Sequence, residues 1–459
     1  MHAKFLSLAA ACSLSVSALA APDYYGDIRP MIDQHCLMCH TDESISFSFA
    51  DSDFTYNLGP AIVATVSDRR MPPWLAEPGH QQYVEDISLS SAEIETFLAW
   101  ADAGFPRGEP VSRNGAPPAL APSFQADLAL DVLPGQPYLP RQDRADDYRC
   151  FVMDWPLDEL AYVTGFRAAP GNLRVVHHLV LFAVQPQLAE RFRELQDAEE
   201  GPGYQCFGAA VPDRLGLPEH RQAYEERYPD GVIELHRGNY WLAHWAPGMD
   251  GYSFPAGTGI PIPPGTVLVA QMHYYSVYAP GEADAGSRME FQVSSQVDRP
   301  AINMPITFNP WFEGRSNRSL VVPPGQSARY ATGFTLHGIA GYMARLFGVD
   351  PARVEAVEVH SANLHMHRFG ASGRVTLNEP TGRQNILLSV PRWDLNWQRD
   401  FTFVEPKVFP APLLERARLD VECVFENPTE NDVLGGYGSD DEMCMNLSYV
   451  ALRLAEPEA

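Results

Sequence analysis

The stretch that decides the fold is HHLVLFAV, residues 177–184. It begins with two histidines and continues as a strongly apolar run of the β type. This stretch belongs to the first of several short runs of this type, which are broken by Pro and Gly turns. They cover residues 173–184, 266–277, 288–297, 354–367, 374–377, 417–425 and 447–454. This spacing predicts a mainly β protein built from β-sandwich or jelly-roll domains, with one helix over residues 186–200 as an insertion.

The composition agrees with this fold class. A chain of 459 residues is expected to form two to four domains, each with its own core. Forty Pro, 34 Gly and 11% aromatic residues suit a turn-rich β protein better than a helical bundle. A net charge of -25 and a pI near 4.9 argue against nucleic acid and against anionic membranes as partners.

The first twenty residues have the pattern of a signal peptide. Lys4 is followed by an apolar or small run from Phe5 to Ala20, and Ala18-Leu19-Ala20 fits the cleavage rule. A membrane anchor is the alternative, but the run is shorter than the roughly 20 residues a span needs. No later stretch is long and apolar enough to span. We therefore expect residues 1–20 to be removed and the protein to be periplasmic, with no membrane span.

Residues 36–40, CLMCH, match the C-x-x-C-H haem-attachment motif. Two thiols at this spacing reach the two vinyl groups of a haem, and the adjacent histidine meets the iron from the same side. We therefore expect one covalent haem c on Cys36 and Cys39, with His40 as an axial ligand. A redox dithiol or half of a zinc site is the alternative, and the following histidine and the missing second C-x-x-C weigh against it.

The second axial ligand is predicted at Met71, in RMPPW (residues 70–74), with His80 as the competing ligand. A Met thioether opposite a histidine raises the potential of the iron and suits electron transfer. Helices are expected over residues 27–34 and 90–103, the second with Ser90 as its capping residue. Residues 21–108 are thus predicted to form a small all-α cytochrome c domain, followed by a Pro/Ala-rich linker over residues 109–124.

Four of the seven cysteines remain once Cys12 and the haem motif are set aside. An even number in an exported protein indicates two disulfides, although free buried thiols are the alternative. Four cysteines allow three pairings. The pairing we favour is Cys423–Cys444 with Cys150–Cys206.

Several histidines lie in the predicted strands. In His365-x-His367 both side chains point to the same face of a strand, so both can hold one metal ion. Neighbours such as His177 and His178 normally face opposite ways, so both can bind one ion only if the strand bulges or twists there. Core or hydrogen-bonded histidines are the alternative for each pair. Four further histidines are expected to be structural or at the surface: His236, His244, His337 and His360.

Five motifs, in order over more than 250 residues, resemble the copper type II, ascorbate-dependent monooxygenases. This family includes peptidylglycine alpha-hydroxylating monooxygenase and dopamine beta-monooxygenase, and the likeness covers roughly residues 125–455. The motifs are VVHHLVLF (175–182), AHWAPGMDGYSFPAGTGI (243–260), VLVAQMHYYS (267–276), LHMHRFG (364–370) and ECVFENPTENDVLGGYGSDDEMCMN (422–446).

The resemblance implies two copper ions held between two successive jelly-roll-like domains, over residues 125–300 and 301–455. The first ion, which transfers electrons, would be bound by His177, His178 and His273. The second, where O₂ is activated, would be bound by His365, His367 and Met443. A soft thioether favours Cu(I) and argues against zinc at that second site.

The resemblance also implies the activity, namely hydroxylation of a substrate C–H bond with O₂. It supports a Cys423–Cys444 bridge that holds the methionine segment, whereas the pairing of Cys150 with Cys206 has no such support. The substrate, a small molecule or a peptide, is not specified by the sequence.

Two features depart from the family pattern. The animal members take electrons from ascorbate, whereas this chain carries its own predicted cytochrome, so we expect an external donor to reduce the haem and the haem to reduce the first copper. A tyrosine that often follows the Met-Cys pair is displaced here to Tyr449, which puts its role in doubt. The alternative functions are a non-catalytic haem and copper protein for electron transfer or copper handling, and a carbohydrate-binding β-sandwich.

Overall fold

The structure is a computed structural model of the chain. It describes residues 21–40, 47–110, 124–207, 210–212, 226, 234–235, 237–246, 249, 251–277, 279–308, 316–379, 381–436 and 440–456. The predicted signal peptide and most of the predicted linker lie outside the described residues. The chain divides into two compact units, one of Met1–Trp74 with Ile87–Leu120 and one of Leu75–Asp86 with Ala121–Ala459. No helix among the described residues has both the length and the apolar composition needed to cross a membrane.

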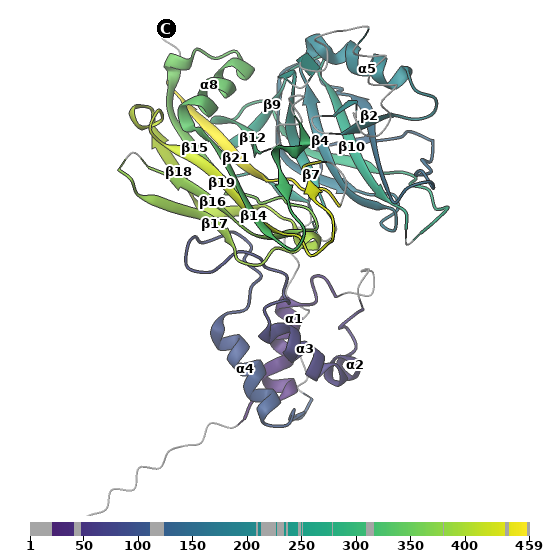
Figure 1. Cartoon of the computed structure of the whole chain (residues 1–459), viewed down its shortest axis with the longest axis vertical. Coiled ribbons are helices and arrows are strands. Elements are labelled where there is room, and N and C mark those ends of the chain that lie inside the picture. Colours follow the sequence, from purple (N-terminus) through teal and green to yellow (C-terminus); the bar gives the residue numbers. More distant parts are fainter. Residues whose placement is uncertain are drawn as a thin grey trace, which may run out of the picture. The chain divides into compact units, whose positions relative to one another are not determined.

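The smaller unit is helical (Figure 1). The helices expected over residues 27–34 and 90–103 are present with slightly shifted ends, and Ser90 and Glu93 form a reciprocal capping box at the start of the second. Apolar side chains from all the helices pack around the buried Trp100 and Ile32. The elements are η1 (Tyr24–Ile28), α1 (Arg29–His35), α2 (Ser52–Asn57), α3 (Gly59–Ser67) and α4 (Ser91–Asp102).

Residues 75–86 fall inside the predicted haem domain but belong to the larger unit. The backbone N–H of Glu77 donates to the carbonyl of Ser389 at 2.8 Å, and that of Val84 donates to the carbonyl of Thr402 at 2.8 Å. Tyr83, between them, is buried. These backbone bonds add the segment to the larger unit, so the helical unit is interrupted in sequence where the prediction made it continuous.

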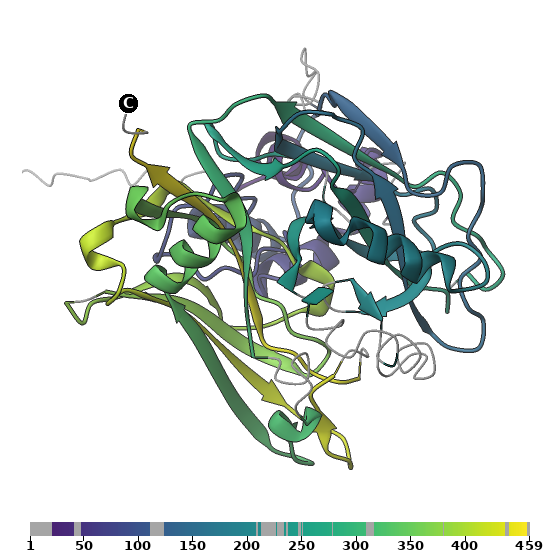
Figure 2. The ribbon, with the colours of Figure 1, turned by 90° about the horizontal axis from the view of Figure 1, so that it is seen from above.

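The larger unit is mainly β. Its strands fall into two groups in Figures 1 and 2, with the blue to teal strands together and the green to yellow strands together. One nine-stranded sheet contains strands of both groups because β9 and β12 pair in parallel over two residue pairs. In order its strands are β1 (Leu128–Asp131), β11 (Arg288–Ser294), β3 (Ala161–Ala169), β9 (Thr258–Ile262), β12 (Arg299–Thr307), β21 (Met445–Leu454), β15 (Val354–Ala362) and β18 (Phe401–Pro410), with β8 (Tyr252–Ser253) beside β3.

Each group completes its two layers with a further sheet, so the described strands form paired sheets of the β-sandwich type. The early group has the order β6 (Val211–Pro212), β5 (Tyr204–Phe207), β2 (Asp146–Asp154), β10 (Val267–Tyr275), β4 (Val176–Val184) and β7 (Asn239–Trp245). The late group has β14 (Ser327–Thr335), β19 (Arg418–Glu426), β16 (Gly370–Asn378) and β17 (Gln384–Val390), and a small sheet of β13 (Val321–Val322) and β20 (Val433–Leu434).

Short helices and turns connect the strands. The helix expected over residues 186–200 is present as α5, whereas α8 lies where no helix was expected. α8 is amphipathic and is capped by Thr335, whose hydroxyl accepts a hydrogen bond from the N–H of Gly338. The connecting elements are η2 (Pro186–Leu188), α5 (Ala189–Asp197), η4 (Asn317–Ser319), α8 (Leu336–Phe347), η5 (Pro351–Arg353), η6 (Leu395–Trp397) and η7 (Ala411–Leu413).

The position of β4 within its sheet explains why HHLVLFAV is apolar after its two histidines. From Leu179 to Val184 every residue of β4 is buried, with no alternation. On one face, Phe182 packs with Phe192 of α5 in a single apolar cluster. A strand covered on both faces needs apolar residues at every position, since burying each such side chain contributes about 1.5–3 kcal/mol. β4 and the neighbouring β10 carry His177, His178 and His273 at their ends.

Candidate metal centres

The first histidine set is brought together by a β-bulge. His273 of β10 pairs with His178 of β4, but the next residue, Tyr274, pairs with Val176, so His177 is the extra residue. A bulge turns a side chain that would point away. His177 and His178 therefore both face His273, although they are neighbours in the chain. From the sequence alone, such a bulge was required if both were to bind one ion.

The three imidazoles converge closely enough for one metal ion. His177 Nδ1 lies 3.1 Å from His178 Nδ1, and His273 Nδ1 lies 3.2 Å from that same nitrogen. Among the described His, Cys, Asp and Glu residues, these three form the group whose ligand atoms all lie within 4.8 Å of one another. Bonds of about 2.0 Å to a tetrahedral ion would place nitrogens about 3.3 Å apart. The observed spacing fits such an ion.

Neighbouring side chains orient this set, and burial favours the neutral form of two of its imidazoles. His273 Nε2 lies 2.8 Å from Asp146 Oδ1, and the Tyr148 ring stacks on the His273 ring at 4.1 Å. Burial, and then the charge of His273, lowers the pKa of His177 to about 4. Burial also holds the pKa of His178 well below its usual value. Imidazoles that stay neutral at pH 7 keep the lone pair that a metal needs.

The second set lies beyond the end of β15. The strand predicted over residues 354–367 ends at Ala362, so His365 and His367 do not lie in a continuous strand as expected. His365 instead forms an isolated antiparallel bridge with Met445, with backbone bonds of 2.8 and 3.1 Å. Beyond that bridge the backbone pairing stops, and the N–H of His367 donates to the carboxyl group of Glu442 at 2.9 Å. Glu442 directly precedes Met443, so the segments that carry the two histidines and the methionine lie beside each other.

Each imidazole of the second set is held by a hydrogen bond at its Nδ1 atom. His365 Nδ1 lies 2.5 Å from Gln398 Oε1, and His367 Nδ1 lies 3.1 Å from the carbonyl oxygen of Asp441. A ring whose Nδ1–H donates to an oxygen presents Nε2 as its metal-binding atom. The rings of His365 and His367 have centroids 5.1 Å apart. Burial lowers the pKa of His365, which favours its neutral form.

Glu442 ties the two segments of the second set together. Its fully buried carboxyl group accepts hydrogen bonds from the backbone N–H of His367 at 2.9 Å, of Phe369 at 2.6 Å and of Met443 at 3.2 Å. Burial raises the pKa of Glu442 to about 8 despite those three N–H groups, which act to lower it. One side chain thus fixes the backbone at a histidine and at the methionine.

The two sets are within electrostatic reach of each other. After burial and the charges of its own set, the charges of His365 and His367 also lower the pKa of His178. The early and late strand groups therefore contribute one set each to a shared region of the larger unit.

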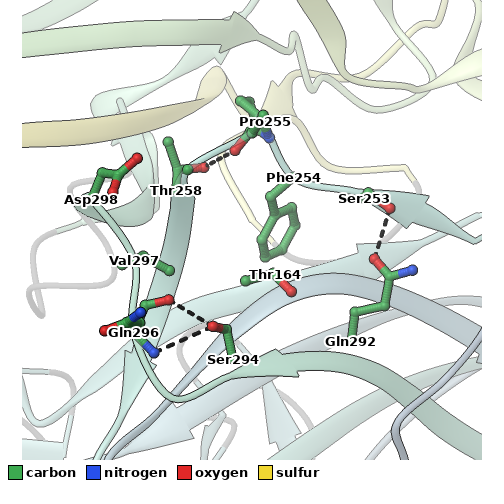
Figure 3. A pocket seen from close by; sticks show the side chains of 12 residues that line it. Thr164, Ser253, Phe254, Pro255, Thr258, Gln292, Ser294, Gln296, Val297 and Asp298 are labelled. Atoms are coloured by element: carbon green, nitrogen blue, oxygen red, sulfur yellow. Dashed lines mark hydrogen bonds between the residues drawn. The ribbon is translucent and has the colours of Figure 1, made fainter.

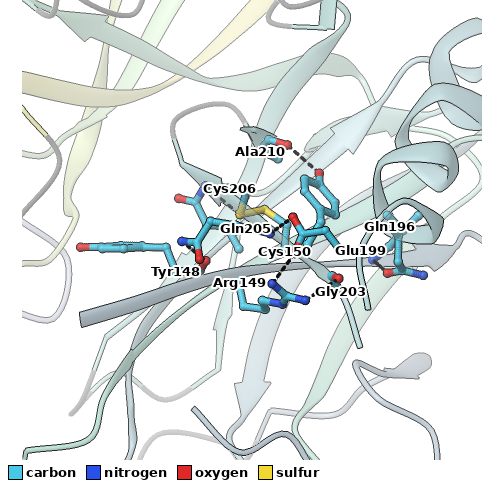
Figure 4. The surroundings of a disulfide bond; sticks show 12 residues. Tyr148, Arg149, Cys150, Gln196, Glu199, Gly203, Gln205, Cys206 and Ala210 are labelled. Atoms are coloured by element: carbon cyan, nitrogen blue, oxygen red, sulfur yellow. Dashed lines mark hydrogen bonds and ion pairs between the residues drawn. A yellow bond between two sulfur atoms is a disulfide. The ribbon is translucent and has the colours of Figure 1, made fainter. Parts of the chain in front are cut away.

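Both favoured disulfides are present. Cys423 and Cys444 have Cα atoms 5.7 Å apart, and Cys444 directly follows Met443. Cys150 and Cys206 have Cα atoms 5.8 Å apart and join β2 to β5. Figure 4 shows that second bridge next to Tyr148 and the buried Arg149–Glu199 ion pair of 2.6 Å. Two disulfides indicate an oxidising, exported setting.

The residues expected to hold a haem lie in the smaller unit. Burial, and then the charge of Cys39, raises the pKa of Cys36 to about 12. His40 Nδ1 lies 2.9 Å from the carbonyl oxygen of Phe47, which orients the ring. Met38, Phe47 and Phe54 are 46%, 56% and 44% exposed. Large apolar side chains exposed around the motif are surfaces that a flat apolar group could cover.

The two candidates for the second axial ligand fall in different units. Met71 belongs to the unit that contains Cys36, Cys39 and His40, whereas His80 belongs to the larger unit. There His80 Nε2 lies 3.2 Å from Glu77 Oε2, which also accepts a hydrogen bond from Ser389 at 2.7 Å.

A pocket of about 600 Å³ lies in the larger unit and is lined by none of the six candidate ligands (Figure 3). Thr258 and Phe254 form part of its wall. The Thr258 hydroxyl lies 2.9 Å from the Tyr449 hydroxyl, and the Phe254 ring lies 4.9 Å from the Tyr449 ring. The displaced Tyr449 is thus buried against this pocket wall.

Comparisons with known proteins assign no family to the chain. No family model and no curated protein matches it. Among solved structures, it is similar to an N-glycanase F (9% identity, TM-score 0.30), covering 72% of this chain and 97% of that one. It is similar to the major capsid protein P2 of bacteriophage PM2 (6% identity, TM-score 0.25), covering 72% and 99%. Likenesses this weak carry no information about function.

Sequence reasoning missed the residues that support the candidate ligands. Asp146 and Tyr148 lie on β2, whose sequence DDYRCFVMD mixes polar and apolar residues and predicted no strand. Gln398 follows a short turn, and Glu442 lies in an acidic run typical of a surface loop. A signal for Glu442 was its place directly before Met443. Nothing local distinguishes Gln398.

Proposed function

We propose that the protein is a copper-dependent monooxygenase that hydroxylates a C–H bond of an organic substrate, with electrons supplied through a covalent haem. The overall reaction combines the substrate, O₂, two electrons and two protons, and yields the hydroxylated product and water. The observation that carries the proposal is the bulge that turns His177 and His178 toward His273, with nitrogens 3.1 and 3.2 Å apart. The proposed fold is two tandem jelly-roll-like domains that meet near residue 300, which the paired sheets support.

Copper, when bound, would supply one-electron transfer at the first set and activation of O₂ at the second. His177, His178 and His273 would hold the first ion, with Asp146 orienting His273. Three imidazoles would also suit zinc, so the first set alone does not select copper. His365, His367 and Met443 would hold the second ion, and the thioether favours copper there.

The protein's own residues prepare the second set. Gln398 and the Asp441 carbonyl fix the two rings, Glu442 fixes the backbone on both sides, and the Cys423–Cys444 bridge anchors Met443. Because Met443 is only 3% exposed, water has little access to the thioether. Preorganised ligands in a partly dry site avoid reorganisation when the metal changes its oxidation state.

The haem part of the proposal rests on Cys36, Cys39 and His40, with Met71 as the second ligand. Cys36 and Cys39 would hold the haem through thioether bonds, and the attached haem would supply one-electron transfer. His40 is already oriented by the Phe47 carbonyl.

Metal analysis with optical and spin-resonance spectra tests the proposal. We expect two type II coppers and one haem c per chain, and O₂ consumption by the reduced protein that depends on a C–H substrate. The matched control is His337→Ala, an exposed histidine on α8, which should bind copper like the wild type. Full copper loading without substrate-dependent O₂ consumption would leave only an electron-transfer or copper-handling protein. If the protein binds no copper, both the monooxygenase and the copper-handling functions would be contradicted.

A further inference from the structure

His244 is a buried imidazole for which the two metal sets give no role. It lies on β7, and its side chain is 13% exposed. Its Nε2 lies 3.3 Å from Asp400 Oδ2, within ion-pair distance. Neither ring nitrogen makes a hydrogen bond to any described residue, although both are buried. A buried polar atom without a partner costs about 1–3 kcal/mol, so such atoms usually face a water, an ion or a ligand.

The strand register places His244 next to the second set. β15 and β18 pair Ala362 with Phe401, and continuing that register puts Asn363 opposite Asp400 and His365 opposite Gln398. The contacts agree with this register. Asn363 Nδ2 donates to Asp400 Oδ1 at 2.9 Å, and His365 contacts Gln398 at 2.5 Å.

Asp400 is therefore one same-face step, about 6–7 Å, from the residue that holds His365. His244 is in turn attached to Asp400.

The surroundings of His244 resemble those of His273, a candidate ligand of the first set. His273 has Nε2 on the carboxylate of Asp146 and presents Nδ1 to the other imidazoles. His244 has Nε2 near the carboxylate of Asp400 and an Nδ1 that is buried without a hydrogen bond. A carboxylate on one nitrogen with the other directed to a metal is the usual arrangement of a ligating histidine.

We propose that His244 is a further ligand of the second metal ion, joining His365, His367 and Met443 through Nδ1, with Asp400 orienting its ring. This inference rests on the proposed function, since it needs an ion at the second set. It replaces the expectation that His244 is structural. A third imidazole would make the second set richer in nitrogen than two imidazoles and a thioether, and nitrogen ligands suit Cu(II).

The number of imidazoles on the second ion tests the proposal. We would use the full chain with His177→Ala and His273→Ala, which disable the first set, and load it with Cu(II) alone. Pulsed spin resonance should then count three coordinated imidazoles, and two after His244→Ala is added. Copper affinity should fall at least 10–100-fold, the range seen when even a group that orients a ligand is lost.

Two further variants keep the result interpretable. Asp400→Asn should retain three imidazoles but weaken copper binding, because the ring loses its orienting carboxylate. His337→Ala should change neither quantity. Two imidazoles on the second ion, whether or not His244 is present, would overturn this inference and leave the proposed function standing. Absence of Cu(II) from the second set of a folded protein would instead overturn the proposed function.

Discussion

The two candidate metal sets are built from opposite kinds of backbone. The first lies on β4 and β10, central strands whose ladder hydrogen bonds and apolar cover fix the three histidines. The second lies on irregular segments beyond the end of β15 and before β21. There the buried carboxyl of Glu442, the Gln398 contact and a disulfide replace the ladder. A sheet can therefore preorganise ligands through its ladder, with one bulge to turn a side chain, whereas irregular backbone needs polar groups and covalent bonds for the same purpose.

The largest expected contrast is in pH dependence of the metal-free protein. The pKa of Glu442 is raised from 4.5 to about 8 in the folded state. Keeping this carboxyl protonated therefore costs more free energy as pH rises from 4.5 to 8, and the stability of the fold falls over that range. His177 has its pKa lowered to about 4 from 6.5, so stability falls as pH drops from 6.5 to 4. The full effects are about 5 and about 3 kcal/mol.

Denaturant unfolding as a function of pH measures both slopes. Glu442→Gln should remove the loss on the alkaline side, and His177→Ala should reduce the loss on the acid side. Suppose Glu442→Gln kept the wild-type loss of stability at high pH and His177→Ala kept the wild-type loss at low pH. The proposed contrast between the two sets would then be wrong.

The disulfides should differ in their contribution to stability. Cys150–Cys206 closes a separation of 56 residues, and Cys423–Cys444 one of 21. Loop-closure entropy gives about 4 kcal/mol for the first bridge and about 3 kcal/mol for the second. Paired Cys→Ala variants, measured by unfolding, should follow that order. Metal binding should follow the reverse order, because only Cys444 adjoins a candidate ligand. Equal metal loss in the two variants would contradict this.

The smallest expected effect is on the groups that orient the rings. Asp146→Asn should weaken metal binding at the first set by about 10–100-fold, and Gln398→Ala should do so at the second. This corresponds to roughly 1.4–2.7 kcal/mol. Titration with Cu(II), using the spectrum of each set, separates the two sites. Should Asp146→Asn weaken the second set as strongly as the first, the sets would not be independent.

The sequence alone determined the class of the fold and the residue types of the candidate ligands. The runs around residues 173–184 and 266–277 became β4 and β10, and both favoured disulfides formed. Strongly apolar strands are recognisable because a strand covered on both faces needs apolar residues at every position. Strands of mixed polarity, such as β2, were not recognised for the converse reason, and the extension of β15 to His367 was wrong.

Only the tertiary structure decided which ligands meet and what supports them. The bulge at His177, the pairing of Met445 with His365 and the placement of residues 75–86 in the larger unit each depend on register between distant segments. The roles of Asp146, Gln398, Glu442 and His244 likewise come from contacts across the sheets. The sequence fixes the type of each side chain at its own position. Whether distant side chains meet at one point depends on how the strands pair and pack, which the local sequence does not specify.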